Sequence, residues 1–184
     1  MLLAALGEHF FWITSRAAGV AVLVASSAAV AAGLLMSGPA RRRVPDLRAI
    51  HEALSLATLG ALLLHALSLL GDEFLSPSLA GIAVPFVSGY QRGWTSLGIV
   101  AGWMLLLLGL SYYARGRIGP ARWRRLHRWT ALAWVFGAVH GIAEGTDAGA
   151  LWFVLAVLVT VVPVAALPAG RLAAPRPDAT TAPA

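Results

Sequence analysis

The chain alternates long apolar stretches with short polar connections. Five stretches have the length that an α-helix needs to cross a bilayer, about 20 residues for roughly 30 Å of hydrocarbon. They cover residues 10–36, 47–70, 94–114, 124–143 and 149–169. The first stretch is too long for the apolar core of a secretory signal, and no basic segment precedes it, so we expect it to be retained. The pattern predicts an all-α integral membrane helical bundle of about five transmembrane helices.

Two further segments are predicted not to cross the membrane. Residues 79–87 are apolar but short, and Pro85 interrupts them, which predicts an interfacial or re-entrant segment. From Pro168 onward the chain is rich in Pro, Ala and Thr, with little apolar surface to bury. We therefore divide the chain into one transmembrane helical domain, residues 1–170, and a disordered cytoplasmic tail, residues 171–184.

Composition agrees with a membrane protein and excludes several redox groups. Of the 184 residues 59% are hydrophobic and only 12% are charged, whereas a soluble domain has about 25% charged residues. The chain has no cysteine, which excludes disulfides, iron–sulfur clusters, thiolate-ligated haem and haem attached through a CxxCH motif.

The charged residues predict an orientation. All fourteen basic residues are arginines, and twelve of them lie in segments that alternate spans place on one side. By the positive-inside rule that side is cytoplasmic, which places the N-terminus outside, and we expect a bacterial plasma membrane. Arginines confined to short clusters between apolar runs argue against a nucleic-acid partner. The twelve are Arg41, Arg42, Arg43, Arg48, Arg115, Arg117, Arg122, Arg124, Arg125, Arg128, Arg171 and Arg176.

Four histidines lie within two of the predicted spans. His51 and His65 are 14 residues apart on the second span, and His127 and His140 are 13 apart on the fourth. Both spans run outward, so His51 and His127 should share an inner depth, and His65 and His140 an outer depth about 20 Å away. A spacing of 13 turns the second pair about 140° apart on an ideal helix, which requires a tilt or a bulge, for which Gly137 is a candidate.

Paired intramembrane histidines favour haem ligation. One intramembrane histidine is explained equally well by a hydrogen bond to a backbone carbonyl, but four in depth-matched pairs favour a function. Two neutral imidazoles can bind opposite faces of a haem iron without bringing charge into the lipid, and they leave no open coordination position. The sequence therefore predicts two bis-histidine b-type haems used for electron transfer, with an acceptor that orients each imidazole.

Two segments carry a family resemblance. WRRLHRWTALAWVFGAVHG, from Trp123 to Gly141, and SRAAG, from Ser15 to Gly19, resemble the ferric-reductase-like transmembrane domain family over roughly residues 12–165. This family includes ferric reductases, the membrane part of NADPH oxidases and the haem-binding membrane subunit of the periplasmic methionine sulfoxide reductase system. The resemblance implies that the four histidines bind the haem irons. It also implies that Arg16 meets the propionates of the outer haem, or else its side chain extends to the outer headgroups.

The chain departs from the larger family members because it has no flavin- or nicotinamide-binding motif. Its electrons should come from a separate protein, a quinol or a small bound flavin, and we predict no catalytic residue. The expected function is that of a membrane oxidoreductase component, a dihaem cytochrome passing single electrons from a cytoplasmic-side or quinol donor to an extracytoplasmic acceptor.

Two other functions stay open at this point. One is a cytochrome b membrane anchor that delivers electrons from a peripheral dehydrogenase to quinone, which requires a quinone pocket near a haem edge. The other is a haem-free transporter or scaffold, although the spans show little of the internal repetition and broken helices of a transporter.

Overall fold

The computed structural model describes residues 2–37 and 46–173, with side chains described for residues 9–37 and 46–166. Arg41, Arg42 and Arg43, the side chain of Arg171, and residues 174–184 of the predicted tail lie outside this part. The described part of the chain is mostly helical and contains no strand. Its elements are α1 (Leu2–Met36), α2 (Leu47–Ser68) with a 3₁₀ turn η2 (Leu69–Gly71), α3 (Leu79–Ala83), α4 (Arg92–Leu110), α5 (Arg115–Ile118), α6 (Pro120–His127), α7 (Thr130–Glu144) and α8 (Leu151–Ala173).

The prediction of an all-α bundle is confirmed, and each predicted span coincides with a helical segment. Three helical segments are both long and apolar enough to cross a membrane: His9–Met36, Leu47–Gly71 and Arg92–Leu110. α7 has 15 residues, and the apolar part of α8 with described side chains, Leu151–Ala166, is also shorter than a full span. The protein is therefore a membrane protein by this criterion, and the count of five spans stays a prediction.

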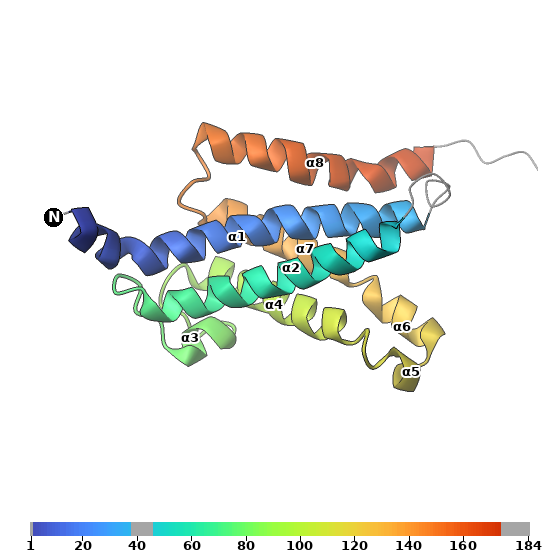
Figure 1. Ribbon diagram of the computed structural model, residues 1–184, viewed down its shortest axis with the longest axis horizontal. Coiled ribbons are helices and arrows are strands. Elements are labelled where there is room, and N and C mark those ends of the chain that lie inside the picture. The colour runs from blue at the N-terminus through green and yellow to red at the C-terminus, as the bar shows by residue number, and fades with distance from the viewer. Residues whose placement is uncertain (1, 38–45, 174–184) are drawn as a thin grey trace, which may run out of the picture.

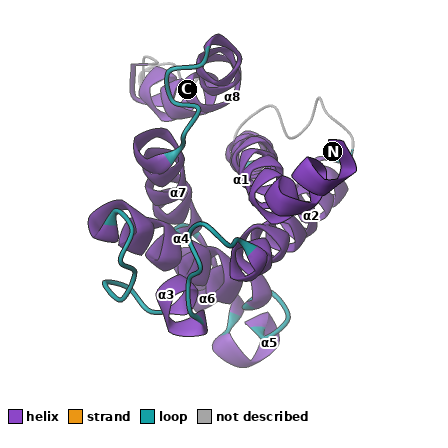
Figure 2. Cartoon of the chain, turned by 90° about the vertical axis from the view of Figure 1, so that its left-hand side faces the viewer, coloured by secondary structure: helices purple, strands orange, loops and turns teal. Residues whose placement is uncertain are grey.

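The helices form two antiparallel pairs. α1 packs along α2, and α4 packs along α7, while α8 lies against α1 (Figure 1). Viewed along the bundle, the two pairs stand side by side with α8 at the outside (Figure 2). α1 also contacts α7, and α2 contacts α4, so the two pairs form one bundle. This arrangement brings α2 together with α6 and α7, the helices that carry the four histidines.

Small residues fill the contacts between helices, and large apolar residues face outward. Ala18, Ala29, Ala32 and Ala133 are buried, as is Ser27. Leucines and valines of α2 and α8 are instead about half exposed, which suits side chains in contact with lipid. The small-residue stretch of α1 thus packs against helices of the same chain, as close helix contact in membranes requires.

The fourth predicted span is broken. α6 ends at His127 and α7 begins at Thr130, and the intervening turn has a bond from the Trp129 amide to the Leu126 carbonyl, 3.0 Å. This i to i+3 bond tightens the turn, and a 3₁₀ turn rotates the chain more per residue than an α-helix does. The break therefore reduces the angular mismatch between the two histidines. Gly137, the candidate soft point, lies within α7, which continues through it as an α-helix.

The segment around α3 folds back along α4. The indole nitrogen of Trp103 donates to the Ala83 carbonyl, 2.7 Å, and the Phe86 amide donates to the Ser96 hydroxyl, 2.7 Å. Because Trp103 lies about 16 Å along α4 from Arg92, the segment runs beside the helix and not beyond its end. This is the course of a re-entrant or interfacial segment.

The charged residues separate to the two ends of the bundle. α5 and α6, with their arginines, lie at the same end as the start of α2, while α3 and the α7–α8 loop lie at the other (Figure 1). Asp72, Glu144 and Asp147 belong to that second end. We refer to the arginine-rich end as the inner end and to the other as the outer end.

Candidate functional site

The structure brings the four candidate histidines together in two pairs. His51 on α2 faces His127 at the end of α6, with ring centroids 5.9 Å apart and ring planes at 85°. His65 on α2 faces His140 on α7, with centroids 6.5 Å apart and planes at 71°. We call these the inner pair and the outer pair. They join the same residues that the spacing along the two spans predicted.

The separations within each pair fit two imidazoles on one metal ion. Rings that bind opposite faces of an iron through Nε2 have centroids about 6 Å apart, given metal–nitrogen bonds of about 2 Å. In the described part of the chain, no three His, Cys, Asp or Glu side chains gather as a metal ion held by protein alone would need. Each pair supplies two ligands only, so the donor set fits an iron whose other ligands come from a porphyrin.

Three of the histidines are oriented by backbone carbonyls through Nδ1. The His51 Nδ1 lies 2.8 Å from the Ala29 carbonyl, the His65 Nδ1 lies 2.8 Å from the Ser15 carbonyl, and the His140 Nδ1 lies 3.0 Å from the Trp94 carbonyl. A carbonyl only accepts, so these contacts place the ring proton on Nδ1 and leave the Nε2 lone pair free to bind a metal. The predicted orienting acceptors are therefore present for these three rings.

The fourth histidine, His127, is held differently. Its Nδ1 is buried and has no hydrogen-bond partner of normal geometry in the described structure, although the Leu108 carbonyl interacts with the ring. The ring instead stacks on the indole of Trp123, with centroids 4.9 Å apart and planes at 24°. The Trp123 indole nitrogen in turn donates to the Ser111 hydroxyl, 3.1 Å.

Glycines on neighbouring helices make room for three of the rings. A Cβ placed on Gly19 would lie 3.2 Å from the His65 ring, and one on Gly33 would lie 3.4 Å from the His51 ring. A Cβ on Gly98 would lie only 2.6 Å from the His140 ring. The sequence reasoning missed all three as site residues. A signal was available, because Gly19 and Gly33 are 14 residues apart, as are His65 and His51 on the antiparallel partner helix.

Polar side chains surround the outer pair. Glu144 places one carboxylate oxygen 2.9 Å from the His140 Nδ1 and accepts the Thr95 hydroxyl on the other, 2.6 Å. The Ser15 hydroxyl lies 3.1 Å from the His65 Nδ1. Neither Glu144 nor the Ser15 hydroxyl was predicted from the sequence to act at the site. Both add charge or polarity next to the rings of the outer pair.

Arg16, the fifth predicted cofactor-binding residue, forms an ion pair with Asp147 of the α7–α8 loop. Its guanidinium also lies 4.6 Å from the centroid of the Trp12 ring. These contacts stabilise an arginine within an apolar helix and tie the loop to α1. Arg16 follows Ser15, whose carbonyl binds His65, so it lies at the level of the outer pair.

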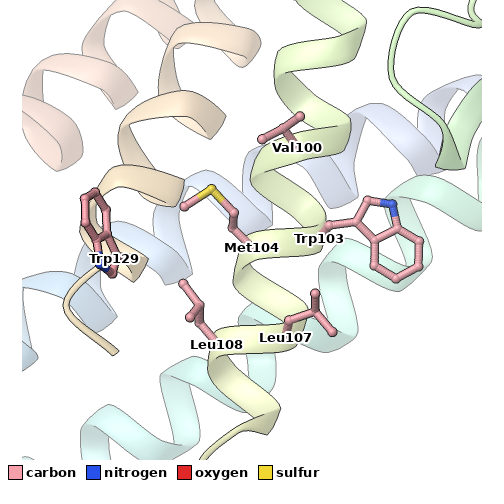
Figure 3. Close-up of a pocket in the computed structure, with 6 residues that line it drawn as sticks. All are labelled: Val100, Trp103, Met104, Leu107, Leu108 and Trp129. Atoms are coloured by element: carbon pink, nitrogen blue, oxygen red, sulfur yellow. The ribbon is translucent and has the colours of Figure 1, made fainter. Parts of the chain in front are cut away.

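A pocket of about 390 Å³ lies between α4 and the start of α7 (Figure 3). Its lining is apolar apart from two indoles, and the Trp103 indole nitrogen is directed away from it toward Ala83. Such a pocket suits an acyl chain better than the polar head of a quinone. The lining residues are Val100, Trp103, Met104, Leu107, Leu108 and Trp129.

Comparison with known proteins returned no match among protein-family profiles, curated proteins or solved structures. The function of the protein is therefore inferred from the histidine pairs and the residues around them.

Proposed function

We propose that the protein is a dihaem b-type cytochrome that passes single electrons across a membrane, in the manner of ferric-reductase-like transmembrane domains. The observation that carries the proposal is the pairing of His51 with His127 and of His65 with His140, at centroid separations of 5.9 and 6.5 Å. Two chance contacts between intramembrane histidines, both near the separation for a shared metal ion, would be unusual.

The protein's own residues supply binding and orientation. His51 and His65 come from one continuous helix, so their spacing is fixed by α2 at about 20 Å. Carbonyls of α1 and α4 hold three rings with Nε2 available as a ligand. A haem bound at each pair would supply a one-electron redox centre there. Because the two pairs lie at different depths, an electron that crosses the membrane would make two shorter transfers instead of one long one.

Charge at the two ends supports an inner electron donor and an outer acceptor. The described arginines of α5 and α6 make no ion pair within 4 Å with a described carboxylate, so their charge stays available at the inner end. A separate donor protein with an acidic surface would be attracted there. The acceptor would then be reached from the outer end, beside His65 and His140. By the positive-inside rule the inner end is cytoplasmic.

The structure gives less support to the two other candidate functions. A quinone-reducing anchor needs a polar contact for the quinone head, and the pocket beside α4 has an almost wholly apolar lining. A haem-free transporter or scaffold gives no reason for four rings held in facing pairs. Neither function therefore replaces the cytochrome proposal.

The decisive experiment is a reduced-minus-oxidised visible spectrum of the detergent-purified protein with pyridine-haemochrome quantitation. We expect a low-spin b-type spectrum and two haems per chain. His51→Ala and His65→Ala should each retain one haem, because each removes a ligand of a different pair.

His9→Ala provides the matched control. His9 is exposed at the start of α1, and its substitution should leave both haems in place. A wild-type protein that binds no haem, either as purified or after reconstitution, would reject the proposal and would favour a transport or scaffold function.

A further inference from the structure

Three of the four histidine rings contact a neighbouring helix in the same way, through a backbone carbonyl and a glycine. The accepting carbonyls belong to Ser15, Ala29 and Trp94. In each case the residue four positions later is the glycine that lies against the same ring: Gly19, Gly33 and Gly98. We call this combination of a carbonyl at position i and a glycine at i+4 the carbonyl–glycine seat.

Helix geometry explains the seat. In an α-helix the carbonyl of residue i accepts the amide of residue i+4 and keeps a second lone pair for another donor. Each Cα–Cβ bond tilts toward the helix N-terminus, so a side chain at i+4 covers that carbonyl. A glycine at i+4 leaves the carbonyl open, and an imidazole can then both bond to it and lie flat against the helix.

His127 has no such seat. The carbonyl that interacts with its ring belongs to Leu108 near the end of α4, and it already accepts the Ser111 hydroxyl, 2.6 Å. The residue four positions later, Tyr112, lies beyond the helix and is not a glycine. The Tyr112 ring packs against Trp123, with centroids 5.8 Å apart, so aromatic side chains fill this region. The buried Nδ1 of His127 correspondingly lacks a hydrogen bond of normal geometry. A hydrogen bond therefore does not fix the orientation of this ring.

We propose that Trp123 is the positioning residue of the inner pair and that its stacking replaces the missing seat of His127. Trp123 and His127 are one turn apart on α6, where side chains at i and i+4 are neighbours. The bond to Ser111 on the α4 side holds the indole, and the indole holds the imidazole at a stacking distance of 4.9 Å. The inference rests on the proposed function, because the ring needs orienting only if it is a ligand.

An alternative role for Trp123 is that of an ordinary interfacial tryptophan, which anchors a helix end among the headgroups. The two roles differ in what a substitution changes. An interfacial anchor affects stability or insertion, whereas a positioning residue affects the inner haem alone.

The test compares Trp123→Leu, which removes the stack, with Trp123→Phe, which keeps a flat ring. Trp152→Leu serves as the matched control, because Trp152 is a half-exposed tryptophan near a helix end whose ring contacts Phe153. The readouts are haem per chain and the low-spin ferric EPR spectrum, with His65→Ala and His51→Ala giving reference spectra of the inner and outer haem.

We expect Trp123→Leu to lose the inner haem or to change its EPR resonance while the outer resonance is unchanged. Trp123→Phe should retain the inner haem with a broadened resonance, because its ring can stack on His127 but has no nitrogen to bond Ser111, and Trp152→Leu should keep both resonances unchanged. Two unchanged resonances in Trp123→Leu, or equal changes at both haems, would overturn the inference. If Trp123→Leu does not fold, Ser111→Ala removes the hydroxyl that accepts the indole N–H and that donates to the Leu108 carbonyl. It should broaden the inner resonance alone, and an unchanged inner resonance would overturn the inference. A wild-type protein without haem would instead reject the proposed function.

Discussion

The inner and outer histidine pairs contain the same kind of side chain but are held by different contacts. At the outer pair, both rings bond to carbonyls, and Ser15 and Glu144 add polar contacts. At the inner pair, only His51 has such a bond, and His127 depends on an aromatic stack. Hydrogen bonds fix both the direction and the protonation of a ring, whereas stacking fixes its plane only. We therefore expect the outer pair to be held more rigidly and the inner pair to be more easily disturbed.

The largest effect is expected from crowding the carbonyl–glycine seats. Gly98→Ala would place a Cβ 2.6 Å from the His140 ring, which the Trp94 carbonyl holds in place and which has the Glu144 carboxylate beside it. The ring or the helix must move, and we expect the outer haem to be lost, leaving one haem per chain by pyridine haemochrome. Gly19→Ala and Gly33→Ala, at 3.2 and 3.4 Å, should have progressively smaller effects.

Gly60→Ala is the control for these substitutions. Gly60 lies on α2 between His51 and His65, and a Cβ added there would meet no atom within 4 Å. This substitution should keep both haems and stabilise the helix by up to about 1 kcal/mol. Full haem content in Gly98→Ala would show that the His140 ring can shift without losing its haem. The outer pair would then be no more rigid than the inner pair.

The ion pair at the outer end gives the next largest effect. Asp147→Asn leaves Arg16 without its carboxylate, and for a partly exposed pair we expect a loss of roughly 1–2 kcal/mol of stability. The thermal unfolding temperature in detergent should fall by a few degrees, with both haems retained. Arg16→Gln should behave in the same way if the pair is structural. Loss of the outer haem in Arg16→Gln but not in Asp147→Asn would support the propionate contact that the family resemblance implies.

These contacts show how far the sequence could predict the molecule. The length of the apolar stretches placed the helical segments, and two histidine spacings on parallel spans were enough to pair His51 with His127 and His65 with His140. The break after His127 was not predictable, because it depends on a tightened turn that no proline or glycine marks. The partner of Arg16 lies 131 positions away in a loop, so only the packing of α1 beside α7 and α8 brings the two together.

A smaller effect is expected from removing the charge of Glu144 beside His140. Glu144→Gln removes a carboxylate 2.9 Å from the His140 Nδ1. A negative charge near an axial ligand favours the ferric state, so its removal should raise the midpoint potential of the outer haem. We expect a shift on the order of 50 mV, somewhat less than a tenfold change in the one-electron equilibrium.

Potentiometric titration followed in the visible spectrum measures this shift, and Glu52→Gln is the matched control at the inner pair. Glu52 follows His51 but is exposed and forms no ion pair with a described residue. Its substitution should leave both potentials nearly unchanged. Equal shifts in the two variants would mean that net charge, and not the contact with His140, sets the potential.

The smallest effect should come from Ser15→Ala, which removes the contacts of the Ser15 hydroxyl with His65 but keeps that of the Ser15 backbone carbonyl. The hydroxyl lies 3.1 Å from the His65 Nδ1 and donates to the His65 backbone carbonyl, 3.1 Å, whereas the Ser15 carbonyl lies closer to Nδ1, at 2.8 Å, and survives the substitution. Because the stronger Nδ1 contact remains, we expect a loss of about 1 kcal/mol of stability with the outer EPR resonance still in place. A large loss of the outer haem would instead show that the hydroxyl orients His65, and the carbonyl–glycine seat would then be insufficient to hold a ligand on its own.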